Sequence, residues 1–100
     1  MDIQTQLKTD MMAAMKSKDT DRLNTIRSLR AAIQSKKLEL NKELTDEDVI
    51  GVISKAAKQR KDSIESYKQG GREDLVAEEE KELSIIENYL PKQMDEGEAA

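Results

Sequence analysis

The sequence predicts an all-α fold of four helices, in which two long antiparallel helices have shorter helices packed alongside. Three observations predict it. Apolar residues recur at intervals of three and four, the period of a helix with one buried face. Glycine and proline, which most often interrupt helices, number four and one in 100 residues. The apolar residues do not recur at intervals of two, as a half-buried strand would require.

The first two helices are expected between about Asp2 and Asn41. Helix one runs to Ser17, and its apolar residues lie on one side: Ile3, Leu7, Met11, Ala14 and Met15. Asp19 or Asp21 can cap the next helix, because either carboxylate can accept from a backbone N–H of the first turn. The apolar residues of helix two are Leu23, Ile26, Leu29, Ile33 and Leu40.

The third and fourth helices are expected on either side of Gly70-Gly71. Thr45 is a candidate N-cap for helix three, and acidic residues 46–48 suit the positive end of the helix dipole. Glycine ends a helix without strain in a left-handed conformation, so helix three ends near Gln69. Helix four runs from about Glu73 to Leu90, before Pro91. We therefore expect breaks at residues 18–20, 42–45 and 70–72.

The charge is uneven along the chain. The net charge is −4, but residues 1–62 hold 13 basic and 10 acidic residues, whereas residues 63–100 hold 4 and 11. Phosphate contacts supply most nonspecific affinity for nucleic acid, so we expect no DNA partner, and any RNA would meet the basic half. No apolar run reaches the roughly 18 residues of a membrane span, so we expect no membrane partner. The absence of cysteine suggests a cytoplasmic protein.

The residue types argue against an active site. Without histidine or cysteine the usual catalytic triads cannot form. Ser54 and Lys58 have a spacing on which a Ser-Lys pair could be built, but a solvated helix surface explains them better. Glutamates 78–80 with Glu82 could be metal ligands, yet the di-iron pattern requires Glu-x-x-His pairs, so an acidic surface is the simpler interpretation. We predict no catalytic residue, metal or cofactor.

A basic stretch on helix three is a candidate phosphate contact. Residues 55–61 contain Lys55, Lys58, Arg60 and Lys61. Lys55 and Lys58 fall opposite the apolar side of the helix and are expected to be exposed. The alternative is that Lys58 and Lys61 form ordinary surface pairs with the acids four residues further on. With two tyrosines as the only aromatic residues, stacking of single-stranded bases is not expected.

Two charged residues fall within apolar stripes. Arg60 lies among the apolar residues of helix three, and Glu79 does so on helix four. A lone buried charge is too costly to keep, so we predict that they form a structural buried ion pair, which Arg30 could join. The alternative is that Arg60 faces a ligand cleft.

Several motifs in order resemble one known family. They are LTDED at residues 44–48, KQRKDSIE at 58–65, GGREDL at 70–75 and YLPKQ at 89–93, with DRLNTIRSLRAA at 21–32. This sequence resembles the YqeY-like family over nearly its whole length. Family members are similar to the C-terminal tail of the B subunit of glutamine-dependent aminoacyl-tRNA amidotransferase.

The resemblance implies a helical domain, here residues 1–91, normally followed by a second small helical domain. We expect residues 92–100 to be an acidic, flexible start of that second domain, which this chain lacks. The resemblance implies tRNA contact without catalysis, in a complex that forms a carbon–nitrogen bond with glutamine as amide donor. The alternative is a protein–protein interaction module that docks a partner on its helical surface. The outward basic residues of helices two and three are the candidate tRNA contacts: Arg27, Lys36, Lys55, Lys58 and Lys61.

Overall fold

The computed structural model describes residues 2–91, and the expected tail at 92–100 lies outside them. The described residues form four α-helices and no strand, which confirms the all-α prediction. The helices are α1 (Ile3–Ser17), α2 (Thr20–Leu40), α3 (Asp46–Gln69) and α4 (Glu73–Glu87). The three breaks lie where the sequence predicted them, and α4 ends three residues before the predicted Leu90.

The helix ends have the expected local chemistry. Asp19 caps α2, with its carboxylate accepting from the backbone N–H of Arg22. Thr45 and Asp48 form a reciprocal capping box at the start of α3, in which each side chain accepts from the other residue's backbone N–H. These bonds hold the pKa of the Asp48 carboxyl below its usual range. Gly71 has a φ of +73°, a conformation that glycine adopts without strain, and the chain turns there into α4.

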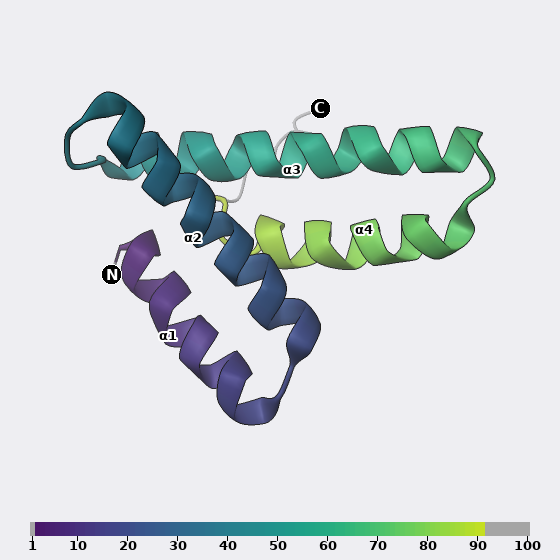
Figure 1. The fold of residues 1–100 in the computed structure, drawn as a ribbon, viewed down its shortest axis with the longest axis horizontal. Coiled ribbons are helices and arrows are strands. Elements are labelled where there is room, and N and C mark those ends of the chain that lie inside the picture. Colours follow the sequence, from purple (N-terminus) through teal and green to yellow (C-terminus); the bar gives the residue numbers. More distant parts are fainter. Residues whose placement is uncertain (1, 92–100) are drawn as a thin grey trace.

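The helices pair as two hairpins, and the two long helices cross (Figure 1). The most extensive contacts are between α3 and α4, and next between α1 and α2. The two long helices α2 and α3 contact each other less extensively than each contacts the shorter helix of its own hairpin. The reason lies in where the apolar residues end. The last buried residue of α2 is Ile33, so its final two turns extend past the core, while α4 covers the rest of α3.

The core lies where the hairpins meet, and α2 contacts all three other helices. Six side chains of the core cluster are at most 2% exposed: Leu7, Ile26, Leu29, Val49, Ile53 and Ile86. The sequence placed Met15 on the inner side of helix one, but it is 50% exposed, and Leu40 is 39% exposed. Both residues lie near the C-terminal end of their helix, after its last buried residue, Ala14 in α1 and Ile33 in α2.

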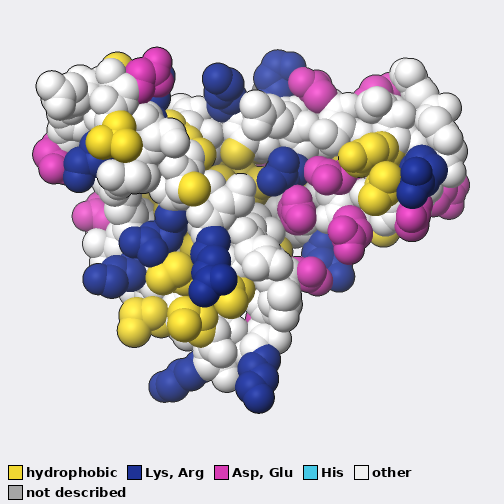
Figure 2. All heavy atoms as spheres, viewed as in Figure 1, with side chains coloured by type: hydrophobic (Ala, Val, Ile, Leu, Met, Phe, Trp, Pro, Cys, Tyr) yellow, Lys and Arg dark blue, Asp and Glu magenta, His cyan; other side chains and the backbone are white. Residues whose placement is uncertain are grey.

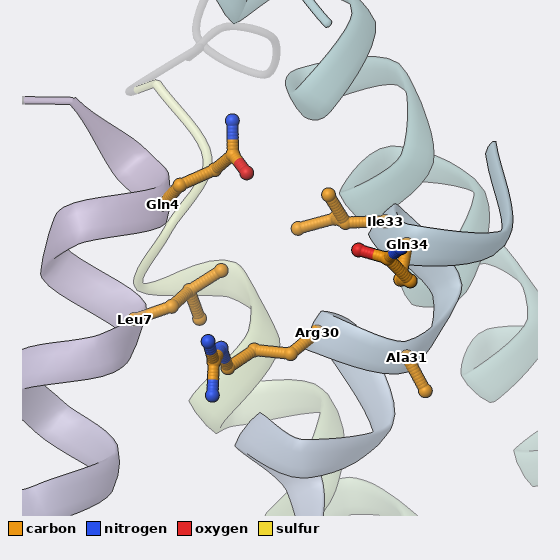
Figure 3. Close-up of a pocket in the computed structure, with 6 residues that line it drawn as sticks. All are labelled: Gln4, Leu7, Arg30, Ala31, Ile33 and Gln34. Atoms are coloured by element: carbon orange, nitrogen blue, oxygen red, sulfur yellow. The ribbon is translucent and has the colours of Figure 1, made fainter. Parts of the chain in front are cut away.

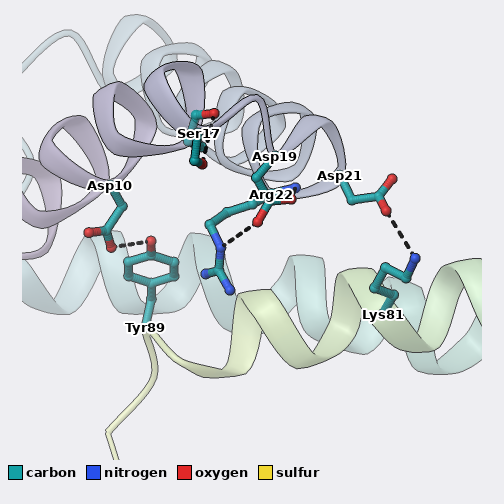
Figure 4. Close-up of polar contacts among 8 residues, drawn as sticks. Asp10, Ser17, Asp19, Asp21, Arg22, Lys81 and Tyr89 are labelled. Carbon is teal, nitrogen blue, oxygen red and sulfur yellow. Dashed lines mark hydrogen bonds and ion pairs between the residues drawn. The ribbon is translucent and has the colours of Figure 1, made fainter.

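Two polar contacts join segments far apart in the sequence (Figure 4). Tyr89, just after α4, donates its hydroxyl hydrogen bond to Asp10 on α1 at 2.5 Å. Burial first, and then this bond, raise the pKa of the Tyr89 hydroxyl, so the tyrosine remains a neutral donor. Lys81 on α4 donates to Asp21 on α2 at 3.0 Å. Together they link both helices of the first hairpin to the second.

Replacing the central side chain of α2 should weaken the whole fold. Ile26→Ala leaves a cavity where three helices meet, and we expect it to lower the free energy of unfolding by about 2–4 kcal/mol. The matched control is Leu38→Ala on the same helix, where Leu38 is 70% exposed and the expected change is within about 0.5 kcal/mol. Urea unfolding followed by circular dichroism measures both, and equal stabilities for the two variants would contradict a core centred on α2.

Candidate binding surfaces

The predicted basic residues of α3 lie in a row on its outer surface. Lys55, Lys58 and Lys61 are all exposed. Lys58 pairs with Asp62 at 3.2 Å, as the alternative interpretation of the sequence expected. Lys61 pairs instead with Glu87 on α4, at 3.9 Å. These pairs are 49–75% exposed, and exposed pairs contribute at most about 1 kcal/mol, so a phosphate could replace the acid at little cost. We call these three lysines the α3 row.

Lys36 lies across a groove from the α3 row. The groove between α2 and α3 has a volume of about 530 Å³, and both Lys36 and Lys55 line it. The residues that line it include the small apolar side chains of Ala32, Val52 and Ala56. Lys36 pairs with Glu39 at 3.8 Å, which is also in the groove. The crossing of the two helices thus places a fourth predicted cation beside Lys55.

Arg27 lies apart from the other predicted tRNA contacts. At about 100° per residue, the nine positions between Arg27 and Lys36 place them on opposite sides of α2. Arg27 is exposed and forms no ion pair with an acid among residues 2–91. The structure therefore gathers four of the five candidates at α3 and leaves Arg27 on the side of α2 that adjoins α1.

A second basic surface, which the sequence analysis did not single out, lies on the first hairpin (Figure 2). It covers α1 and the adjoining side of α2, where basic and exposed apolar side chains gather together, while acidic side chains are prominent over α3 and α4. We call it the α1–α2 face and define it by these residues: Lys8, Met12, Met15, Lys16, Lys18, Arg27 and Arg30. In the sequence, Lys8 and Lys16 are eight residues apart and Arg27 and Arg30 are three apart. Such spacings are common, so they did not indicate this surface.

Arg60 lies between two glutamates of α4. Its Nε atom is 3.6 Å from Oε1 of Glu79 and 2.9 Å from Oε1 of Glu82. The three side chains are 21–32% exposed. Neither Nε of Arg60 nor Oε1 of Glu79 makes an aligned hydrogen bond within the described residues, so attraction between charges dominates the contact. Burial raises the pKa of the Glu82 carboxyl, and the Arg60 guanidinium partly opposes that shift.

Arg30 does not join this ion pair. It lies at the mouth of a small groove of about 290 Å³ between α1 and α2, beside Gln4, Leu7 and Gln34 (Figure 3). Its guanidinium donates to the thioether sulfur of Met11 at 3.3 Å. The acids beside Arg60 come from α4, which the sequence pattern could not orient against α2.

No group of three or more potential metal ligands occurs among residues 2–91. No helix in the same range is long and apolar enough to cross a bilayer. Of the four glutamates of α4 at positions 78–82, Glu78 and Glu80 are exposed, whereas Glu79 and Glu82 are partly exposed and contact Arg60. What the geometry offers is two basic surfaces, suited to binding.

Comparison with known proteins gives a consistent family. The family model described as Yqey-like protein matches residues 4–100. Curated relatives are named "Altered inheritance of mitochondria protein 41, mitochondrial". The relative from Vanderwaltozyma polyspora is 41% identical over 84% of this chain and 46% of its own length. The relative from Lachancea thermotolerans is 42% identical over 90% of this chain and 49% of its own length. The relative from Kluyveromyces lactis is 42% identical over 83% of this chain and 45% of its own length.

This chain thus spans about half the length of the curated relatives it matches. Their names place those relatives in mitochondria. The cytoplasmic location expected from the sequence stays a prediction.

The ion pair between α3 and α4 should behave as a coupled unit. Arg60→Met leaves Glu79 and Glu82 facing each other without a counter-charge. We expect a loss of about 2 kcal/mol, less than for a fully buried pair because water still reaches these groups. Adding Glu79→Leu should recover part of that loss, since the double variant buries apolar groups instead. A double-mutant cycle by urea unfolding measures the coupling, and additive effects of the two changes would show that Arg60 and Glu79 do not interact.

Proposed function

This chain belongs to the Yqey-like protein family, and from that premise we propose that it is an accessory tRNA-binding module without catalytic activity of its own. We infer a relationship to the tail domain of the B subunit of glutamine-dependent aminoacyl-tRNA amidotransferase. In such a complex, other domains release ammonia from glutamine and form the carbon–nitrogen bond. The role left to this module is to hold the tRNA.

The observation that favours this proposal is the α3 row with Lys36 beside it. Lys55, Lys58 and Lys61 follow one another at intervals of three, which is about 4.5 Å along a helix axis. Adjacent phosphates of an RNA strand are spaced on a similar scale, so successive ammonium groups could contact successive phosphates. Lys36 adds a cation from the other wall of the groove.

The chemistry of the row favours recognition of shape over sequence. Lysine binds phosphate as a point charge and does not distinguish bases. Duplex RNA also hides its base edges in a deep, narrow groove that side chains cannot enter. We therefore expect the module to contact the backbone of a folded tRNA. With a net charge of −4 and three or four phosphate contacts, binding should be weak and should decrease steeply as salt rises.

Titration of folded tRNA into the protein at low and at physiological salt tests the proposal. The variant Lys55→Glu/Lys58→Glu removes two contacts and adds repulsion, so we expect about a tenfold or greater loss of affinity at low salt. The matched control is Arg27→Glu/Arg30→Glu, which changes the net charge by the same −4 but leaves the α3 row intact. Its affinity should fall much less, and both variants must keep the helical circular dichroism of the unchanged protein.

Two results would contradict the proposal. Equal losses in the two variants would show that affinity follows net charge and not the α3 row. Absence of binding to any tRNA at low salt, by protein shown to be folded, would favour the protein-partner alternative.

A further inference from the structure

The outer side of α1 carries two methionines that the described residues leave at least half exposed. Met12 is 57% exposed and Met15 is 50% exposed. With Ala13 and Lys16 they line an open depression of about 510 Å³ at the C-terminal end of the helix. Long apolar side chains at neighbouring surface positions are unusual on a monomer, and methionine is over-used at surfaces that bind other proteins because it is flexible and polarisable.

Basic side chains surround these methionines. Lys8 precedes Met12 by one helical turn, Lys16 and Lys18 follow Met15, and Arg27 and Arg30 come from the adjoining side of α2. Arg30 donates to the sulfur of Met11, the residue that precedes Met12 on α1. An apolar centre with a polar rim is the usual composition of a protein interface, and here the rim is basic.

The charge of this rim is not balanced within the hairpin. Residues 2–40, which include both helices of the hairpin, contain five acids, and each already has another contact, Glu39 with Lys36. Asp2 accepts from the backbone of Thr5, Asp10 accepts from Tyr89, and Asp21 pairs with Lys81. The fifth, Asp19, pairs with Arg22. The five basic residues of the α1–α2 face form no ion pair with any acid among residues 2–91, so the rim lacks negative charge that a partner could supply.

We propose that the α1–α2 face docks an acidic amphipathic helix of a partner protein. Apolar side chains of that helix pack on Met12 and Met15, and its flanking aspartates or glutamates pair with the basic rim. The distance between Lys8 and Lys16 along α1 is about 12 Å, so two to three turns of the partner span the face. RNA is the less suitable ligand, because a duplex backbone offers no apolar group to cover two methionines.

This surface is independent of the proposed tRNA contact, since none of its residues lies in the α3 row or its groove. It also explains Arg27, which α2 separates from the other candidate tRNA contacts. A module with one basic row for RNA and one methionine-centred face for a protein can hold a tRNA and attach to a partner at the same time. The face is small, so the attachment is transient and its association rate depends on salt.

Selection from a displayed library of helical peptides, in which apolar and charged positions vary independently, tests the proposal. We expect the selected peptides to be acidic, with apolar residues spaced at three and four. Their binding should shift the ¹³C-methyl signals of Met12 and Met15. Met12→Gln/Met15→Gln should reduce their affinity about tenfold or more, whereas the control Leu38→Gln, at an exposed leucine on the far part of α2, should leave it unchanged.

Lys8→Gln/Lys16→Gln should weaken binding several-fold at low salt, with a smaller effect at high salt. The proposal fails if the selected peptides are neutral or basic, if the methionine variant binds them as tightly as the unchanged protein, or if no peptide is selected. It also fails if tRNA shifts the Met12 and Met15 signals, because the face would then belong to RNA. None of these results depends on whether Lys55→Glu/Lys58→Glu affects tRNA affinity.

Discussion

Burial of the apolar side of α2 is the constraint on which the rest of the structure depends. Ile26, Leu29 and Ile33 fill the space between α1 on one side and the α3–α4 hairpin on the other. Because this side is only about two and a half turns long, α2 can cross α3 but cannot lie along it. The crossing then opens the groove with Lys36 and Lys55 on one side of α2 and leaves the α1–α2 face on the other.

The two surfaces differ because the helices around them differ in charge. The α3–α4 hairpin is rich in acids, and Lys58 and Lys61 each pair with a carboxylate there. The first hairpin has fewer acids, and the five basic residues of the α1–α2 face form no ion pair among the described residues. Weak, salt-sensitive contact with RNA phosphates suits the α3 row, and attraction of an acidic protein suits the α1–α2 face.

Local features of the sequence predicted the helices well, because caps and breaks depend on neighbouring residues. Thr45 with Asp48 and Gly70-Gly71 define helix ends by hydrogen bonds and backbone conformations that act within a turn or two. The contact of Arg60 with Glu79 could also be anticipated, since a charge within an apolar stripe needs a partner and α4 follows α3 through a short turn. Each of these inferences needed only one helix or one hairpin.

The arrangement of the two hairpins could not be predicted in the same way. The pairing of α2 with α3, the exposure of Met15 and the position of Arg30 all depend on the angle at which two helices cross. Helical periodicity states which side is apolar but not how much of it a neighbour covers.

Native-state hydrogen exchange measures directly whether α2 joins the two hairpins into one unit. If it does, the slowest-exchanging amides of α2, around residues 25–33, should have the same free energy of opening as the slowest-exchanging amides of α3. That value should equal the global free energy of unfolding. If the amides of α1 and α2 instead open together at lower free energy while α3 and α4 stay protected, the hairpins are separate units and α2 does not unite them around a shared core.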